Sequence, residues 1–98
     1  MVTECVRLDL NFPDFQGQLF NLDAGELRPI FKTFKKLSGM SWAEVYADHG
    51  LQWEEIKSMK GKYTIRLSRQ CRAVVVREGE FICFRGIHTD HDGAYGKK

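Results

Sequence analysis

The last third of the chain, residues 63–95 with the sequence YTIRLSRQCRAVVVREGEFICFRGIHTDHDGAY, decides the fold. It contains an alternating run at 63–67, the β-branched run CRAVVV at 71–76 and an apolar run at 81–87. Runs of this kind, separated by polar turn residues, indicate three consecutive antiparallel strands. The sequence therefore predicts an antiparallel sheet that is followed by a polar tail.

The two turns between these strands determine which side chains share a face. We expect Ser68–Gln70 to form a three-residue loop, which pairs Arg66 with Arg72 on one face of the sheet. We expect Glu78–Gly79 to form a two-residue hairpin turn, because its glycine can adopt the positive φ that such a turn needs. That turn pairs Arg72 with Arg85. Together the turns predict a row of three arginines across one face.

An arginine row has a physical implication. Like charges that lie directly opposite one another destabilise a sheet, so the row is maintained more easily if an anion binds there. The alternative is a set of solvated charges at a sheet edge. The other face is expected to be apolar and to consist of Ile65, Leu67, Cys71, Ala73, Val75, Ile82 and Phe84.

The beginning of the chain predicts a strand and a loop. Residues 4–12 alternate between apolar and polar side chains, which is typical of a strand with one buried face. The proline that follows ends this strand. Residues 14–22 are expected to form a loop that places Phe15, Leu19 and Phe20 under the core.

Two helices are expected before the sheet. Residues 24–38 carry apolar side chains at helical spacing, and Asp23 with Glu26 resembles a capping box. Pro29 conflicts with that start because an interior proline costs about 3 kcal/mol, so the regular helix is expected to begin near Pro29. The sequence SWAE at 41–44 is a second capping box and predicts a short helix.

These elements predict one α+β domain over residues 1–98. An N-terminal strand and two helices would pack on a twisted antiparallel sheet of about four strands. Residues 51–56 are ambiguous between helix and strand, and their place before the sheet favours a short strand. The expected parts are a strand and loop at 1–22, a helical hairpin at 23–50, an antiparallel sheet at 51–88 and a C-terminal tail at 89–98.

The formal net charge of +2 of this 98-residue chain conceals an asymmetry. Residues 1–56 hold 5 Lys/Arg and 9 Asp/Glu, a net of −4, whereas residues 57–98 hold 10 Lys/Arg and 4 Asp/Glu, a net of +6. A basic concentration on one part of a small domain indicates a nucleic-acid partner. It would equally receive an acidic protein segment.

Hydropathy and cysteine spacing exclude other classes of protein. The sequence has no apolar run long enough to span a membrane and no charged-then-apolar leader, so we expect a cytoplasmic protein. Cys5, Cys71 and Cys83 lie in strand patterns without metal-type spacing. We expect them to be small buried hydrophobic residues.

The tail after the last expected strand, HTDHDGAY at 88–95, carries residues with ligand and acid–base chemistry. Two His and two Asp within five residues are competent metal ligands, but no distant third cluster completes a site. A simpler interpretation is that Asp90 or Asp92 caps a turn by accepting hydrogen bonds from nearby N–H groups.

The same region has the residue types that RNA cleavage requires. Cleavage through the RNA's own 2′-hydroxyl needs a base, cations that stabilise the phosphorane, and an acid for the departing oxygen. A histidine such as His88 can serve as either acid or base, and Tyr95 can donate a proton or stack on a base. Arginine side chains match the geometry of phosphate.

The order of elements and the stretch at 61–96 resemble the RelE/ParE superfamily of type II toxins. The shared pattern is a strand with a basic residue, RAVV after a turn, a short hairpin, and a tail with His followed by Tyr. This resemblance, to the RelE and HigB branch, implies a RelE-like fold and a small basic ribonuclease that cuts mRNA in the ribosomal A site. It also implies an antitoxin whose extended or helical segment wraps the toxin. ParE-type members instead poison DNA gyrase.

The resemblance also implies roles for individual residues. Arg66 and Arg72 match basic positions on the two central strands, and His88 and Tyr95 match the C-terminal His-or-Lys and Tyr positions. His91 is an alternative to His88 as the working histidine. The basic residues expected to hold RNA are Lys57, Lys60, Lys62, Arg69 and Arg85.

Three functions remain open on the sequence alone. The first is a ribosome-dependent mRNA endonuclease toxin that uses no cofactor, with the ribosome, mRNA and a cognate acidic antitoxin as partners. The second is a binding module of the same fold, such as a gyrase poison. The third is a metal-dependent hydrolase that uses the HTDHD tail at 88–92.

Overall fold

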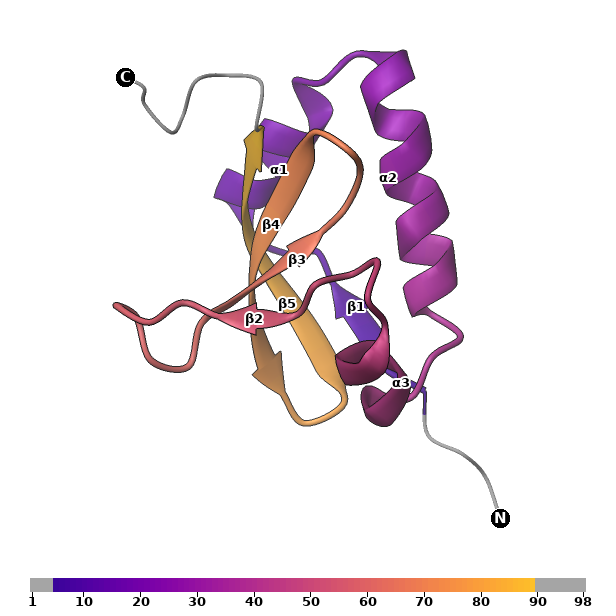
Figure 1. The fold of residues 1–98 in the computed structure, drawn as a ribbon. Coiled ribbons are helices and arrows are strands. Elements are labelled where there is room, and N and C mark those ends of the chain that lie inside the picture. The colour runs from indigo at the N-terminus through magenta and orange to yellow at the C-terminus, as the bar shows by residue number, and fades with distance from the viewer. Residues whose placement is uncertain (1–4, 90–98) are drawn as a thin grey trace.

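A computed structural model describes residues 5–89, and within them the chain forms a five-stranded sheet with helices on one face (Figure 1). The strands are β1 (Arg7–Asp9), β2 (Glu54–Glu55), β3 (Tyr63–Arg66), β4 (Cys71–Glu78) and β5 (Phe81–Thr89). Their order in the sheet is β1-β5-β4-β3-β2. Strands β2 to β5 form an antiparallel meander, whereas β1 pairs with β5 in parallel. The predicted antiparallel sheet therefore gains a parallel edge strand.

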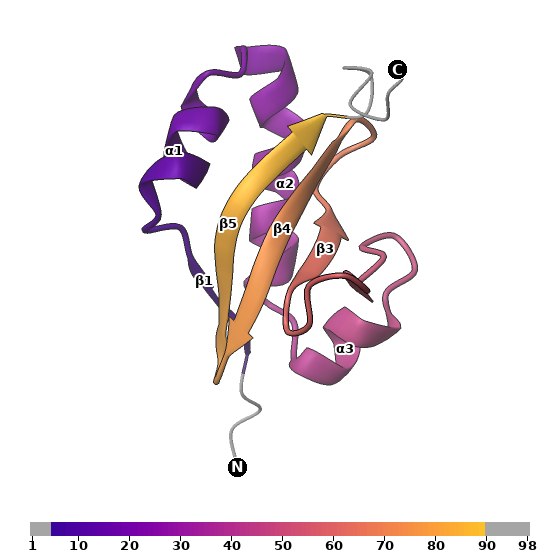
Figure 2. The same cartoon turned by 90° about the vertical axis from the view of Figure 1, so that its left-hand side faces the viewer.

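The helices of the described region are α1 (Pro13–Phe20), α2 (Ala24–Leu37) and α3 (Trp42–Ala47). When the sheet faces the viewer, all of them lie behind it or beside it (Figure 2). The predicted α+β class is confirmed. The opposite face of β3, β4 and β5 is therefore not covered by any helix of the described region.

The buried face of the sheet is the one that the sequence predicted. Its expected members are all buried: Ile65, Leu67, Cys71, Ala73, Val75, Ile82 and Phe84. The ring of Phe84 lies 5.2 Å from that of Phe15 on α1 and 5.4 Å from that of Phe34 on α2. Edge-on and tilted rings at such distances are favourable, so this aromatic group joins both helices to the sheet.

Helix α2 begins at Ala24, although the sequence favoured a start near Pro29. Asp23 and Glu26 form the complete capping box, with side-chain to backbone distances of 2.9 and 3.1 Å. The helix also buries Ile30, Phe34 and Leu37. Full burial of such a side chain is worth about 1.5–3 kcal/mol, so three of them exceed the cost of about 3 kcal/mol for the interior proline.

The predicted loop at 14–22 is a helix. Helix α1 starts at Pro13, whose fixed φ suits the first helical position and whose missing N–H is not needed there. Phe15 and Leu19 are buried as expected, four residues apart on one side of the helix. Phe20 is 68% exposed, so its prediction was wrong.

The hairpin between β4 and β5 has a different register from the one predicted. Glu78 pairs with Phe81, so the turn residues are Gly79 and Glu80. The φ of Gly79 is +61°, and a positive φ at the first turn position is typical of a type II′ hairpin. The sequence interpretation had placed this glycine at the second position, which shifts the strands relative to one another by two residues.

A β-bulge shifts the register by one further residue. It falls between the pairs Val74–Gly86 and Val75–Phe84, so Arg85 is the extra residue of β5. A bulge disrupts the ladder, and the N–H of Ile87 donates to Oε1 of Gln18 on α1 at 2.8 Å. The contact with α1 therefore satisfies a backbone donor beside the bulge.

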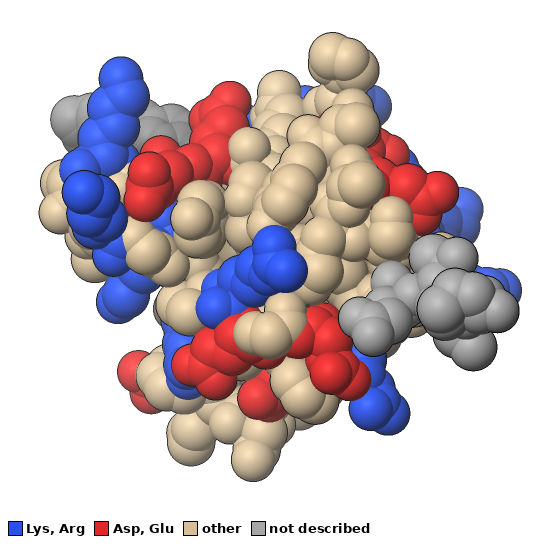
Figure 3. Space-filling model, turned by 90° about the horizontal axis from the view of Figure 1, so that it is seen from below, with Lys and Arg blue, Asp and Glu red and all other residues tan. Residues whose placement is uncertain are grey.

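An aromatic cluster lies where α3 meets the sheet. Ring centroids of neighbouring members are 4.8–5.6 Å apart, and the guanidinium of Arg77 lies 4.1 Å from the ring centroid of Trp42. The cluster consists of Trp42, Tyr46, Trp53 and Tyr63. Seen from below, uncharged side chains form a continuous surface at this end, with charged groups around it (Figure 3).

Two further sequence expectations concern cysteine and membranes. Cys71 and Cys83 are buried as expected, but Cys5 is exposed. Within residues 5–89, no helix combines the length and the apolar character needed to cross a membrane.

Candidate functional site

Arg66, Arg72 and His88 form a row across three neighbouring strands. Arg66 of β3 is the direct partner of Arg72 of β4, as the three-residue turn predicted. Arg72 is in turn the direct partner of His88 of β5. Directly paired residues point to the same side of a sheet, so two guanidinium groups and an imidazole share one face.

Arg85 does not belong to this row, contrary to the prediction. The type II′ turn and the bulge together move His88 into the place opposite Arg72 that the sequence analysis gave to Arg85. The guanidinium of Arg85 instead lies 4.7 Å from the ring centroid of Phe12, and its Nη2 lies 3.8 Å from Oε2 of Glu78. The corrected row contains two fixed cations and one titratable group.

Gln52 holds Arg72 in place. Its Oε1 accepts a hydrogen bond of 2.7 Å from Nη2 of Arg72. The backbone of Gln52 has a φ of +53°, the left-handed region that L-residues rarely adopt. The neighbouring residue Leu51 accepts a hydrogen bond of 2.7 Å from the N–H of Arg66. The segment before β2 thus braces both arginines, with backbone strain at the residue that contacts Arg72.

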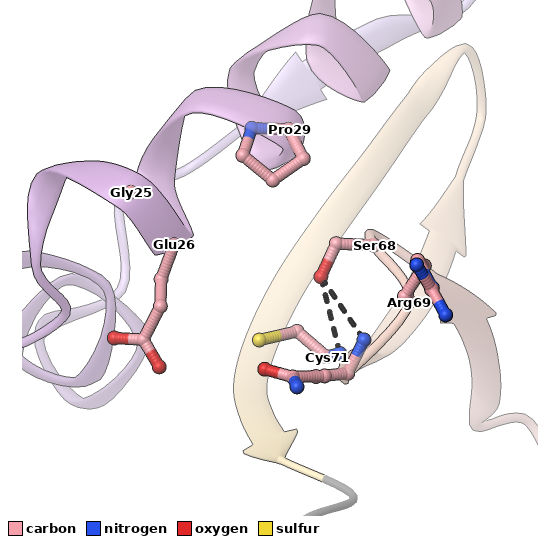
Figure 4. A pocket seen from close by; sticks show the side chains of 7 residues that line it. Gly25, Glu26, Pro29, Ser68, Arg69 and Cys71 are labelled. Carbon is pink, nitrogen blue, oxygen red and sulfur yellow. Dashed lines mark hydrogen bonds between the residues drawn. The ribbon is translucent and has the colours of Figure 1, made fainter.

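Arg66 is oriented by the turn that follows its strand. Its Nε donates to the carbonyl of Ser68 at 3.3 Å, and its Nη2 donates to the carbonyl of Arg69 at 3.4 Å. Oγ of Ser68 accepts hydrogen bonds from the N–H groups of Gln70 and Cys71, which closes the turn (Figure 4). These contacts use part of the guanidinium and leave other N–H groups for a ligand.

The same turn faces the first residues of α2 across a pocket of about 460 Å³. Glu26 and Arg69 lie on opposite sides of it (Figure 4). Glu26 already accepts a hydrogen bond from the N–H of Asp23. We assign no ligand to this pocket.

A second pocket, of about 550 Å³, lies on the outer face of the sheet and includes His88. Its floor is apolar and its edge carries basic groups. The residues around it are Phe12, Lys62, Val74, Val76, Arg85, Gly86 and His88. Two of the predicted RNA-binding residues, Lys62 and Arg85, therefore lie beside the predicted catalytic His88.

The other predicted site residues are more dispersed. Lys57 and Lys60 are exposed in the loop between β2 and β3, and Arg69 is exposed in the turn after β3. His91 and Tyr95 lie outside the described residues, so their predicted roles stay predictions. Most of the HTDHD stretch also lies outside them, and residues 5–89 contain no group of three or more potential metal ligands.

Cys83 is unsuited to act as a nucleophile. Burial raises the pKa of its thiol, and the nearby carboxylates of Glu78 and Asp9 add to that effect. A thiol in such surroundings stays protonated, and the thiol is far less reactive than the thiolate. The groups available for chemistry on the outer face are the arginine pair and the imidazole.

The row and the pocket together suit a phosphodiester with an attached base. Guanidinium groups donate paired hydrogen bonds to phosphate oxygens, and an imidazole can move a proton near neutral pH. An apolar floor beside them can receive the flat face of a base. The arrangement therefore has a place for phosphate, proton transfer and base on one surface.

Gln52, Phe12 and Gln18 were missed by the sequence analysis. Gln52 lies in a segment with an ambiguous pattern, and nothing in its type or spacing indicates contact with a residue twenty positions away. Phe12 was assigned to a strand, and Gln18 to a loop. Recognising Pro13 as a helix start would have placed Gln18 on a helix and exposed this error.

The comparisons with known proteins support the fold. No family model and no curated protein sequence matches this chain. Among solved structures, a copper-bound mutant of a toxin from Helicobacter pylori has a similar fold, with a TM-score of 0.53 and 16% sequence identity. The similarity covers 89% of this chain and 97% of that toxin. The similarity shows that this chain shares the fold of that protein over most of its length.

Proposed function

We propose that this protein is the toxin of a type II toxin–antitoxin system and that it cleaves messenger RNA on the ribosome. The observation that carries the proposal is the row of Arg66, Arg72 and His88 on three adjacent strands. The resemblance to the RelE branch of the RelE/ParE superfamily and the toxin-like fold support it. The basic character of residues 57–98 agrees with an RNA substrate.

The proposed reaction uses the RNA's own 2′-hydroxyl as the nucleophile. The 2′-oxygen attacks the adjacent phosphorus, the bond from phosphorus to the 5′-oxygen breaks, and a 2′,3′-cyclic phosphate and a free 5′-hydroxyl result. One group removes the proton of the 2′-hydroxyl and another protonates the departing 5′-oxygen. Negative charge grows on the phosphoryl oxygens between these steps.

Arg66 and Arg72 stabilise that growing charge. Both are already oriented before substrate binds, Arg66 by turn carbonyls and Arg72 by Gln52. Donors that are fixed in advance need no reorganisation in the transition state, which is why such groups contribute strongly. His88 transfers one proton, and His91 or Tyr95 of the tail transfers the other.

The outer pocket would bind the nucleotide next to the cleaved bond. Its base packs against Val74 and Val76, and Lys62 and Arg85 contact its phosphate. Lys57 and Lys60 extend the positive surface along the loop before β3. Their contacts with the RNA backbone are ionic, so binding weakens as the salt concentration rises.

The experiment compares Arg72→Ala and His88→Ala with a matched control, Arg7→Ala. Arg7 is exposed on β1 and pairs with Glu80, away from the row. Each protein is added to a cell-free translation reaction, and new mRNA ends are mapped by primer extension. Loss of Arg72 or His88 should reduce the cleavage rate by about 10²–10³. Arg7→Ala should cut like the unaltered protein.

Two results contradict the proposal. One is intact mRNA and normal translation with the unaltered, folded protein. The other is growth arrest that comes from inhibited DNA gyrase, seen as loss of supercoiling without mRNA cuts. The second result would favour the gyrase-poison alternative of the same fold.

A further inference from the structure

A pocket of about 520 Å³ lies beside helix α3, at the end of the molecule that carries the aromatic cluster. We call it the α3 pocket. The residues that line it include Tyr46, Asp48, His49, Gln52, Trp53 and Glu54. None of the described residues around it is Lys or Arg. The α3 pocket therefore combines aromatic rings and carboxylates without a fixed cation of its own.

Two rings of the aromatic cluster form one wall of the α3 pocket. The ring centroids of Tyr46 and Trp53 lie 5.5 Å apart, and the planes of the two rings meet at 60°. Trp53 is also stacked on Tyr63 at 4.8 Å, which fixes its orientation, whereas Tyr46 is 47% exposed. The face of an aromatic ring carries partial negative charge, so exposed ring faces attract cations.

The same cluster already holds a cation from within the chain. The guanidinium of Arg77 lies 4.1 Å from the ring centroid of Trp42 and 5.9 Å from that of Tyr46. Its Nη1 also donates a hydrogen bond to the hydroxyl of Tyr46. These rings therefore accept a guanidinium within the fold. Arg77 is not one of the residues that line the α3 pocket, so it does not fill that pocket.

The charge of this region is negative. Residues 41–56 hold four carboxylates and no Lys or Arg. Asp48 pairs with Lys36 at 2.9 Å, and Glu55 accepts a hydrogen bond from the N–H of Gly61. Glu54 is exposed and takes part in none of the ion pairs found within residues 5–89. Its carboxylate is therefore available to a cationic ligand.

We propose that the α3 pocket binds an arginine side chain on a basic segment of a partner protein. The flat guanidinium lies against Tyr46 and Trp53, and its N–H groups donate to the carboxylate of Glu54. Arginine suits this pocket better than lysine, because a guanidinium is planar and less strongly hydrated than an ammonium and stacks on rings. The other carboxylates of residues 41–56 attract further cations of the same segment. This inference goes beyond the proposed function and does not depend on it.

The α3 pocket and the Arg66–Arg72–His88 row attract ligands of opposite charge. The row presents cations on the open face of the sheet, whereas the α3 pocket carries carboxylates. RNA is therefore attracted to the row and repelled from the pocket. Gln52 lines the pocket and also holds Arg72, so it is left unaltered in the experiment.

The probes are a matched pair of short, fluorescently labelled peptides. In one, arginine alternates with glycine. In the other, citrulline replaces arginine, which keeps the shape of the side chain and removes its charge. Binding to the full chain is followed by fluorescence anisotropy. The arginine peptide should bind about tenfold more tightly than the citrulline peptide, and a peptide with lysine should bind more weakly than the arginine peptide.

Matched variants test the rings of the α3 pocket. Tyr46→Leu should weaken binding of the arginine peptide by about three- to tenfold, because it removes the exposed ring. Phe20→Leu, at an exposed phenylalanine on α1, should leave binding within about twofold. Tyr46→Phe loses the hydroxyl that contacts Arg77 but keeps the ring, so it should bind like the unaltered protein. Thermal unfolding shows that each variant is folded.

Charge reversal tests the carboxylate of the α3 pocket. Glu54→Lys should weaken binding of the arginine peptide by about tenfold, because it places a cation where the guanidinium lies. Asp14→Lys makes the same change in net charge at an exposed position on α1 and should weaken binding by about twofold at most.

Five results overturn the inference. The citrulline peptide can bind as tightly as the arginine peptide, which shows that charge is not recognised. Glu54→Lys and Asp14→Lys can weaken binding equally, which indicates unspecific attraction. Folded Tyr46→Leu can bind as well as Tyr46→Phe, which removes the ring from the contact. Tyr46→Leu can lose affinity for a labelled single-stranded RNA, which makes a nucleobase the occupant. Sedimentation can show a dimer that Glu54→Lys abolishes, which makes a second copy of this chain the occupant.

None of these measurements depends on RNA cleavage. The expected binding pattern in a protein that never cuts mRNA would refute the proposed function and leave the α3 pocket standing. Loss of the pattern in a protein that cuts mRNA would have the opposite meaning.

Discussion

Replacing Gln52 separates the two things that this residue does. Its side chain holds Arg72 through a hydrogen bond of 2.7 Å, and its backbone has a φ of +53°. Gln52→Ala removes the contact and keeps a Cβ in the left-handed conformation. Gln52→Gly removes the same contact and also removes the Cβ, and Gln52→Glu keeps an acceptor for Arg72.

The expected stabilities differ between the variants. Loss of a partly exposed hydrogen bond to a charged group costs about 1 kcal/mol, and both Gln52→Ala and Gln52→Gly lose it. Left-handed backbone costs an L-residue about 1–2 kcal/mol, and glycine avoids most of that cost. Gln52→Gly should therefore be about 1 kcal/mol more stable than Gln52→Ala. For a domain of this size, thermal unfolding should show this as a Tm about 4–8 °C higher.

The expected activities do not follow the stabilities. Both variants release the guanidinium of Arg72, so both should cut mRNA about 10- to 100-fold more slowly in cell-free translation, whereas Gln52→Glu should retain most of the rate. Cleavage at the original rate by folded Gln52→Gly would show that Gln52 does not position Arg72. A lower Tm for Gln52→Gly than for Gln52→Ala would show that the left-handed backbone is not strained.

Two further predictions concern stability. The hydrogen bond from Lys36 holds the pKa of Asp48 below its usual value. The ionised Asp48 therefore stabilises the fold at any pH above the pKa that this residue has in the unfolded chain. The stabilisation is lost as the pH falls through the pKa of Asp48 in the folded protein. Asp48→Asn keeps an acceptor for the N–H of Leu51. In urea unfolding, this variant should lower the free energy of unfolding by about 0.5 kcal/mol near pH 7 and should have no effect at pH 2. An equal loss at both pH values would contradict the ionic account. Gly79→Ala should lower Tm by about 4–8 °C, because Gly79 has a φ of +61°. Gly17→Ala on α1 should raise Tm, because alanine favours a helix more than glycine and nothing lies within 4 Å of the added Cβ. The opposite order of the two Tm values would refute the turn assignment.

The parts of the fold that the sequence predicted well are those that local chemistry determines. Alternation of apolar residues predicted β3, a β-branched apolar run predicted β4, and the capping box at Ser41 predicted the start of α3. The pairing of Arg66 with Arg72 followed from the length of one short turn. Each of these depends on residues that are close together in the chain.

The parts that the sequence did not predict depend on distant residues. A glycine satisfies either hairpin type, so Gly79 alone could not decide between the two registers. The bulge at Arg85 is supported by the hydrogen bond from the N–H of Ile87 to Gln18, two residues that are sixty-nine positions apart, and no local pattern reveals such a contact. These two effects exchanged Arg85 for His88 in the row. The resemblance named His88 as a candidate site residue, but its place opposite Arg72 could not be predicted from the sequence.

The parallel pairing of β1 with β5 has a consequence for the time at which this chain becomes a folded protein. The two strands lie at opposite ends of the described sequence, and Asp9 meets Cys83 across a separation of 74 residues. Closing so long a loop costs chain entropy that only the finished strand pair can offset. During synthesis, β1 must wait until the first residues of β5, Phe81 to Cys83, have left the exit tunnel. The N-terminal edge of the sheet is therefore among the last parts of the described fold to form.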